Sequence, residues 1–404
     1  MTDTARPLLN PGAQVRAQIV LGMGLALMAM GQTVLFALLG PIGRELGLTE
    51  IMVGGIISLA AATVVLASPW WGRRVDEIGR RPVFLTSMVG LAITVLLFTL
   101  ALEAGLRGYW SGWLAFGVLA ATRMLYGFAV TGAQPSAAGW IADTTSAEKR
   151  TGGMAIIGAA YGLGSILGPT LAWILSGYSL LAPLYLIAAF GLGAACLVAF
   201  TVPETNPGRA PTRAKLRASD RRVRATVILA VSVFAVVAAV QQTVAFYVQD
   251  TSGLDTAGTA AEVGKAMALL ALMMFLSQAV IAGLKPMPST LIAIGALVGT
   301  VGCVVLAAWP SSMGLYLSHA LFGLGFGTVI PGLQGQGSLA VEADEQGSVG
   351  GIVAAGMAGG YAVGPLAGTA LYALLPVLPY LLAAGVMTIV SLYAFAAIAR
   401  HRST

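Results

Sequence analysis

One arginine stands inside a long apolar stretch of this sequence. Arg123 lies within residues 112–142, which contain no other lysine, arginine or acidic residue. If the stretch crosses a membrane, burying this charge costs at least about 2.5–3.5 kcal/mol, so the residue is a candidate functional site. The alternative is a structural arginine that donates to backbone carbonyls of a neighbouring helix. His319, in the apolar residues 313–340, is a second candidate because histidine titrates near neutral pH.

A charged segment with two glycines joins two apolar stretches at residues 72–82. Its candidate functional residues are Gly72, Asp76, Gly79, Arg80 and Arg81. Glycines permit a tight turn between helices, and an aspartate is stabilised at the positive N-terminal end of another helix. We therefore expect a conformational latch in which Asp76 contacts the start of the eleventh helix and Arg80 completes the charge network. The alternative is that the arginines serve only to orient the chain.

Acidic side chains are missing from the middle of the apolar stretches. The first stretch contains the neutral Gln32, and the stretch with Arg123 ends at Asp143. If the protein moves protons, Arg123, Asp143 and His319 are the candidates for coupling, with Asp76 as a further possibility. Asp143 is then either a protonation switch or a solvated residue of a loop.

Glycines recur at helical spacing in residues 153–176. The series is Gly158, Gly162, Gly164 and Gly168, followed by Pro169. A spacing of four places pairs of these glycines on shared faces, where a second helix can approach closely, and the proline bends the helix. Residues 349–373 contain a similar ladder, so generic helix packing is the alternative to a specific function.

Polar, aromatic and methionine side chains within the apolar stretches are candidates for lining a substrate cavity. They are Gln32, Tyr126, Gln134, Tyr161, Gln241, Gln242, Tyr247, Met273, Met274, Phe275, Gln278 and Tyr361. Methionine surfaces adapt to varied ligands. For any single methionine or aromatic residue, core packing or lipid contact is the simpler alternative.

The elements that hold these residues must be membrane helices. Of the 404 residues, 57% are hydrophobic and only 9% are charged, whereas a soluble domain carries about 25% charge. This composition excludes a soluble enzyme and a disordered chain, and argues against nucleic-acid binding despite a net charge of +6. Cys196 and Cys303 lie in apolar runs without a redox or zinc motif, and we predict no catalytic or metal site.

Helices of about 20 apolar residues cross a bilayer, and the sequence divides into twelve such spans in two halves. We expect an all-α membrane protein with an N-terminal tail at 1–16, six-helix bundles at 17–202 and 224–399, a basic linker at 203–223 and a C-terminal tail at 400–404. The spans are 17–40, 51–69, 82–102, 112–142, 153–176, 182–202, 224–248, 264–284, 289–309, 313–340, 349–373 and 379–399.

The basic residues predict the orientation. With the N-terminus in the cytoplasm, 18 of the 22 lysines and arginines fall on the cytoplasmic side and only Arg44, Arg107 and Lys265 fall outside. Because cytoplasmic loops carry the excess of basic residues, both termini are expected in the cytoplasm. The excess of basic residues then reflects the orientation of the chain in the membrane.

The two halves carry matching landmarks at an offset of 196 residues. Gly127 falls on Gly323, Pro135 on Pro331, and Arg123 on His319. The Gly168–Pro169 pair likewise falls on Gly364–Pro365. Parallel repeats of this kind occur in transporters, with the substrate path between the halves.

The segment at residues 72–82 resembles the signature of the major facilitator superfamily between helices 2 and 3. The fourth span, with Arg123, Gly127 and a terminal Ala142–Asp143, is similar to that family's fourth helix. The glycines and Gly168–Pro169 of the fifth span resemble the motif of its drug:proton antiporters. The resemblance implies the twelve-helix fold, a role for Arg123 in proton coupling and closure of the outer gate by the fifth helix.

Three features depart from that family pattern. Residues 171–173 read Leu-Ala-Trp where relatives have Gly-Gly, residues 284–288 lack a second copy of the acidic loop, and the first span has no acid. We expect export of a drug-like compound or secondary metabolite across the inner membrane by proton antiport, as a monomer without a cofactor. The alternatives are export of a metallophore such as a siderophore, an importer or facilitator of the same fold, and a non-transporting membrane sensor.

Overall fold

The protein is a bundle of long helices that run between two opposite ends. The computed structural model describes residues 10–145, 147–205, 219–284, 286–342 and 345–402. Within these residues, twelve helical segments are long and apolar enough to cross a membrane, which confirms the predicted number. The helices are α1 (Pro11–Glu45), α2 (Glu50–Ile78), α3 (Arg80–Leu106), α4 (Gly112–Val130), α5 (Ala133–Thr144), α6 (Ala147–Leu175), α7 (Ala182–Thr201), α8 (Arg224–Ser252), α9 (Thr256–Leu284), α10 (Pro288–Ala308), α11 (Ser312–Leu339), α12 (Gln346–Leu374) and α13 (Leu378–Arg402).

Local sequence explains where several helices begin. The side chain of Asn10 accepts a hydrogen bond from the backbone of Gly12 before α1, and Pro11 occupies the first helical position. Thr49 and Ser311 cap α2 and α11 in the same way. These side chains satisfy backbone donors that have no partner inside the helix. Several helices extend beyond their expected limits, and α9 begins at Thr256 rather than at 264.

The expected single helix at 112–142 is interrupted. Helix α4 ends at Val130 and α5 begins at Ala133, although the two together make one membrane span. Pro135 has no N–H to continue the helical hydrogen bonding. A β-carbon on Gly132 would lie 2.7 Å from Val83 and 2.8 Å from Trp71, so the break also brings the backbone close to α2 and α3. The equivalent Pro331 lies inside the continuous helix α11.

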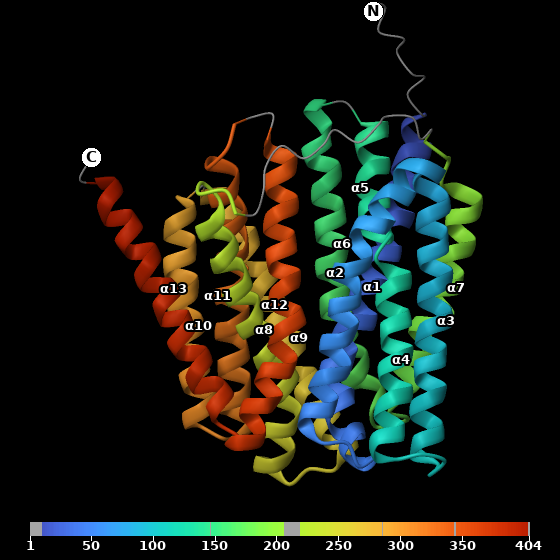
Figure 1. The fold of residues 1–404 in the computed structure, drawn as a ribbon, viewed down its shortest axis with the longest axis vertical. Coiled ribbons are helices and arrows are strands. Elements are labelled where there is room, and N and C mark those ends of the chain that lie inside the picture. The colour runs from blue at the N-terminus through green and yellow to red at the C-terminus, as the bar shows by residue number, and fades with distance from the viewer. Residues whose placement is uncertain (1–9, 146, 206–218, 285, 343–344, 403–404) are drawn as a thin grey trace, which may run out of the picture.

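The two halves of the chain, α1–α7 and α8–α13, lie side by side (Figure 1). The start of α1, the end of α13 and the ends of α7 and α8 that flank the linker all lie at one end of the bundle, here called the terminus end. The other is called the far end. Residues 206–218, most of the expected linker, lie outside the described part of the chain.

The internal repeat is visible in how glycines pack. A β-carbon on Gly164 or Gly168 of α6 would meet backbone atoms of Ala26 or Met30 in α1, and Gly360 and Gly364 of α12 pack equally closely on α8. Each half therefore pairs its fifth span with its first through small residues. Similarly, Gly127 packs on the α2 backbone and Gly323 on the α9 backbone.

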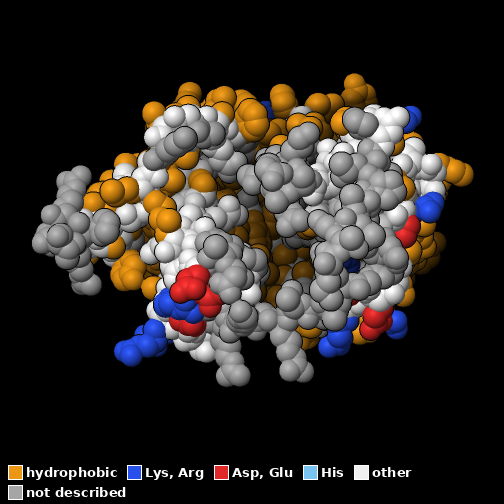
Figure 2. Space-filling view, turned by 90° about the horizontal axis from the view of Figure 1, so that it is seen from above, with side chains coloured by type: hydrophobic (Ala, Val, Ile, Leu, Met, Phe, Trp, Pro, Cys, Tyr) orange, Lys and Arg blue, Asp and Glu red, His pale blue; other side chains and the backbone are white. Residues whose placement is uncertain are grey.

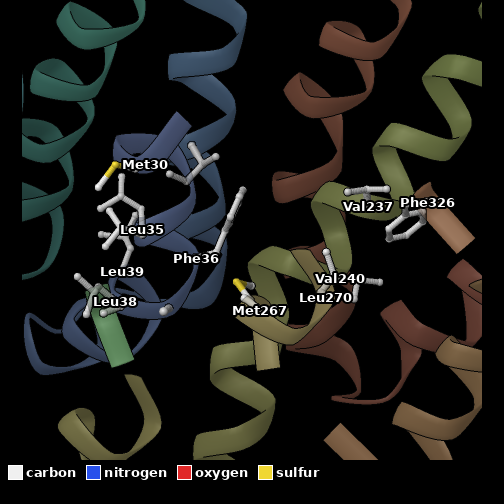
Figure 3. Close-up of a cluster of buried hydrophobic side chains, with 14 of the residues drawn as sticks. Met30, Leu35, Phe36, Leu38, Leu39, Val237, Val240, Met267, Leu270 and Phe326 are labelled. Atoms are coloured by element: carbon white, nitrogen blue, oxygen red, sulfur yellow. The ribbon is translucent and has the colours of Figure 1, made fainter. Parts of the chain in front are cut away.

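The halves contact each other towards the far end and separate towards the terminus end. Contacts between them involve the last turns of α1 and α8 and the first turns of α2 and α9. Apolar side chains from α1, α8, α9 and α11 belong to one buried cluster (Figure 3). Viewed from the terminus end, Figure 2 shows a hollow between the halves with apolar side chains in its depth. The protein therefore has an opening towards the terminus end and a closed far end.

Candidate functional site

Arg123 is buried in the N-terminal half, with only 1% of its surface exposed. Its Nη2 donates to Oε1 of Gln32 in α1 at 3.2 Å. The guanidinium carbon lies 4.1 Å from the ring centre of Tyr126 and 5.5 Å from that of Phe98. Within the described part of the chain, its Nε has no hydrogen-bond partner. Arg123 is thus surrounded by a neutral amide and aromatic faces.

Two of the expected cavity tyrosines are held by hydrogen bonds, one in each half. The Tyr126 hydroxyl donates to the Met28 carbonyl at 3.2 Å. Tyr361 of α12 donates to Gln241 of α8 at 3.4 Å. Of the expected cavity residues, the structure thus places Gln32 and Tyr126 beside Arg123 in the N-terminal half, and Gln241 beside Tyr361 in the C-terminal half. Tyr161 of α6 is partly buried.

The remaining expected cavity residues have other contacts in the described part of the chain, and their place in a cavity stays a prediction. The β-carbon of Met273 and the carbonyl of Met274 lie against Gly323 and Gly327 of α11, within one half. Gln242 is buried, and its amide atoms lack partners within the described residues.

Tyr247 packs edge-on against Tyr380 inside the C-terminal half. Phe275 and Gln134 are exposed, and Gln278 is partly exposed.

His319 is fully buried in the C-terminal half and does not meet Arg123. Its Nδ1 lies 2.9 Å from the Leu315 carbonyl and 3.2 Å from the Ser318 hydroxyl. Its Nε2 has no partner among the described residues, and its ring packs edge-on against Phe322. The repeat places the two residues at equivalent positions, but each lies inside its own half.

The expected latch residues form a network at the terminus end. Arg80 donates from Nη1 to Asp76 at 2.7 Å and from Nε to Asp143 at 3.2 Å. Asp143 also accepts from the Thr205 hydroxyl at 3.1 Å. All of these contacts lie within the N-terminal half and the residues that follow it. The expected contact of Asp76 with the eleventh span remains a prediction for another conformation.

The two glycines of this segment differ in their roles. Gly79 has a φ of 103° and makes the turn between α2 and α3, as expected. Gly72 lies inside α2, and a β-carbon there would meet no atom within 4 Å. The expectation that Gly72 contributes to the turn is therefore wrong. Arg81 donates to the Ala199 carbonyl at the end of α7.

Sequence reasoning missed Glu204, which it placed in the linker. The Glu204 carboxylate accepts from the backbone N–H groups of Arg80 and Arg81 at 3.0 and 3.1 Å, and so caps the start of α3. A negative charge at a helix N-terminus is favourable. The available signal was an acid three residues after the end of α7, directly after Pro203.

Replacing Glu204 with alanine is expected to lower the stability of the protein by about 0.5–1 kcal/mol, the low end for a lost helix cap on an exposed residue. Thermal unfolding of the purified protein in detergent measures this effect. The matched control is Glu77→Ala, which removes only the exposed pair with Arg74. Equal melting temperatures for the two variants would contradict the capping role.

A second missed feature is a charged cluster that joins the halves at the far end. Arg44 of α1 donates to Asp250 of α8, with 2.5 Å between Nη1 and Oδ1, and to Glu50 of α2 at 2.7 Å. Tyr372 of α12 donates to the same Asp250 at 2.6 Å. The sequence places Arg44 and Asp250 far apart, so spacing carries no signal for this contact.

Close backbone contacts surround this cluster. The Ser58 hydroxyl accepts from the Leu366 backbone N–H at 3.1 Å, and a β-carbon on Gly54 would meet Thr369 and the Pro365 carbonyl. Gly264 of α9 lies against Pro169 and Trp173 of α6. The Gly-Gly pair of the family pattern is absent from α6. At this contact the small residue is Gly264, which lies on the neighbouring helix α9.

Replacing Asp250 with asparagine is expected to loosen this closed end. A partly exposed ion pair contributes about 1 kcal/mol at most, which corresponds to a shift of about five-fold in population. The measurement is the labelling rate of a Ser58→Cys variant, without Cys196 and Cys303, by a membrane-impermeant maleimide.

Asp255→Asn is the matched control, because Asp255 lies at the same end and its side chain accepts from the backbone N–H of Gly258 at the start of α9. Labelling that rises equally in both variants, or in neither, would show that the ion pair does not hold the far end closed.

Comparison with known proteins agrees with this architecture. The sequence matches the profile of the Major Facilitator Superfamily over residues 21–353. It is 31% identical to the class C tetracycline resistance protein of Escherichia coli over 336 residues, 79% of this chain and 80% of that protein. It is 32% identical to the class B tetracycline resistance protein of Escherichia coli over 184 residues. This match covers 45% of this chain and 43% of that relative, so it spans less than half of the relative's length.

A solved structure shares the same fold. A bacterial homologue of the human lysosomal transporter Spinster, in an inward-facing and occupied conformation, superimposes with a TM-score of 0.73 at 15% identity and covers 96% of both chains. At this identity the likeness concerns the fold alone.

Proposed function

Because the chain belongs to the major facilitator superfamily, we propose that it exports a small organic molecule, a drug-like compound or secondary metabolite, in exchange for protons. The chain is a multi-pass membrane transporter and not an enzyme. The observation that carries the proposal is the similarity to a tetracycline resistance protein over 79% of the chain.

The orientation follows from the charges. The terminus end carries the basic residues of the 72–82 segment and the residues that flank the linker, so we propose that this end faces the cytoplasm. We propose that the membrane is the inner membrane of the cell. The hollow in Figure 2 then opens to the cytoplasm, and the Arg44–Asp250 contact closes the outside. A cargo enters from the cytoplasm in this conformation.

Release to the outside needs the opposite arrangement of the halves. The contacts between α1 and α8, and between α2 and α12, must separate, while the cytoplasmic ends of the helices approach each other. In that state we expect Asp76 to reach the N-terminal end of α12, whose helix dipole favours a carboxylate. The Arg80–Asp143 ion pair then couples the latch to α5.

Proton exchange is the finer part of the proposal. Asp143 is the acid that follows Arg123 along the fourth span, and it pairs with Arg80 and Thr205 at the terminus end. We propose that Asp143 takes up and releases the proton. Arg123 senses the bound cargo through its charge, and His319 tunes the polarity inside the second half. The transporter acts as a monomer in the bilayer, driven by the proton gradient.

A growth-rescue screen tests export and its direction. The full-length chain is expressed in a bacterial strain that lacks its major efflux pumps, which is then exposed to tetracyclines, other antibiotics and siderophores. We expect higher resistance and lower accumulation of at least one compound, with an Arg123→Gln chain at equal expression as the inactive control. Greater accumulation with the wild-type chain would show import, and unchanged accumulation of every compound would reject the export proposal.

A further inference from the structure

Among the residues that the structure describes, no acidic side chain pairs with Arg123. Its hydrogen bond is to the neutral side-chain carbonyl of Gln32, and its closest aromatic neighbour is Tyr126. The acidic residues in the described part of the chain lie in loops or near the ends of helices. Within that part, the middle of the membrane region therefore carries a positive charge without a carboxylate to balance it.

An uncompensated charge at this depth is costly, and buried charges are normally paired. Contact with aromatic faces offsets part of the cost through cation–π attraction. The Nε donor remains without a partner within the described residues, on a side chain that is 1% exposed. A planar guanidinium with an unused donor is suited to a carboxylate, which it can bind through two parallel hydrogen bonds.

We infer that the cargo itself supplies the missing negative charge, so that this protein carries aromatic organic acids rather than cationic drugs; the inference deepens the proposed export function and rests on it. The acid group binds at Arg123. The planar body of the cargo extends from Tyr126 towards the C-terminal half, where Tyr361 and its partner Gln241 offer neutral hydrogen-bonding groups. A cationic cargo finds no carboxylate there and is repelled by Arg123.

The direction of transport agrees with this charge. The inside of a cell is negative, so the membrane potential itself drives an anion outwards. A transporter of anions therefore needs no acid in the middle of its first span to bind a cation, and α1 has the neutral Gln32 as the partner of Arg123. The departure from the drug:proton antiporter pattern thus has a physical reason.

The test uses three probes that share one ring system and differ in charge. Binding of 2-naphthoate, 2-naphthamide and 2-naphthylmethylammonium to the purified full-length protein is measured in detergent at neutral pH by tryptophan fluorescence and by thermal shift. We expect 2-naphthoate to bind at least ten-fold more tightly than the other two. Equal or tighter binding of the ammonium probe, or no binding of 2-naphthoate at millimolar concentration, overturns the inference.

Variants then assign the preference to the proposed residue. In Arg123→Gln the preference for the anion should fall to within about two-fold, while Arg123→Lys, which keeps the charge but not the planar fork, should retain part of it. Arg107→Gln is the matched control, because Arg107 is an exposed arginine paired with Glu103 outside the site. An anion preference that survives in Arg123→Gln contradicts the inference. If that variant fails to fold, the ratio of the affinity for 2-naphthoate to the affinities for the other two probes in the wild-type protein is the deciding result.

The two proposals fail separately. If the anion binds through Arg123 but no compound leaves the cell, the export function is wrong and the binding site stands. If the growth screen finds export of neutral or cationic compounds that Arg123→Gln leaves unchanged, export stands and the anion site is rejected.

Discussion

Replacing Gly164 with alanine is expected to destabilise the protein by about 1–3 kcal/mol, the cost of overpacking a close interface, and to abolish transport. The new β-carbon would lie 2.1 Å from the carbonyl oxygen of Ala26. The clash is with backbone, so no side-chain rotation relieves it and α6 must move away from α1. Thermal unfolding and efflux of an identified cargo measure the two effects.

The matched control is Gly162→Ala on the same helix. A β-carbon on Gly162 meets no atom within 4 Å, and alanine favours the helix by up to about 1 kcal/mol. This variant should therefore be neutral or more stable, with transport retained. Gly360→Ala, where α12 packs on α8, should behave like Gly164→Ala. Equal effects at Gly162 and Gly164 would contradict the packing of α6 described above.

Replacing Arg123 with glutamine is expected to reduce transport to background and, at the same time, to raise the thermal stability. Removing a fully buried charge relieves a cost of about 2.5–3.5 kcal/mol on insertion scales, against which the lost bond to Gln32 is small. A gain in stability with a loss of activity is the signature of a functional residue held in an unfavourable environment. The measurements are the melting temperature and cargo efflux.

Arg107→Gln provides the comparison, because its side chain is 66% exposed. The Arg107→Gln variant should keep the melting temperature and the cargo efflux of the wild-type protein. If Arg123→Gln lowers the melting temperature and leaves efflux intact, Arg123 is a structural residue, and the central site must lie elsewhere.

Much of the fold follows from the sequence, because the bilayer leaves few choices. Long uncharged stretches must be helices that satisfy their own backbone groups. The predicted number of spans is therefore confirmed, and the chain breaks between 176 and 182 and between 309 and 313, as the expected spans require, to within a residue. The glycines at Gly164 and Gly168 are also correct as sites of close approach. Periodicity could not show that Gly158 and Gly162 face open space, and the expectation of close packing there is wrong.

Other features depend on distant partners and were not predictable. The break before Pro135 has a local cause, but the close approach of Gly132 to Val83 and Trp71 depends on other helices. The Arg44–Asp250 ion pair depends on how the two halves meet, which spacing within either half does not encode. The contact of Tyr361 with Gln241 joins two helices, so the sequence could name both residues but not their pairing.

The most direct test of the account is proton movement driven by cargo. The purified protein is reconstituted into liposomes with an acidic interior, and the membrane potential is clamped at zero with potassium and valinomycin. Adding a cargo identified by the growth screen should release protons from the liposomes in the wild-type protein, and not in Arg123→Gln. Cargo uptake into these liposomes without any release of protons would contradict proton antiport.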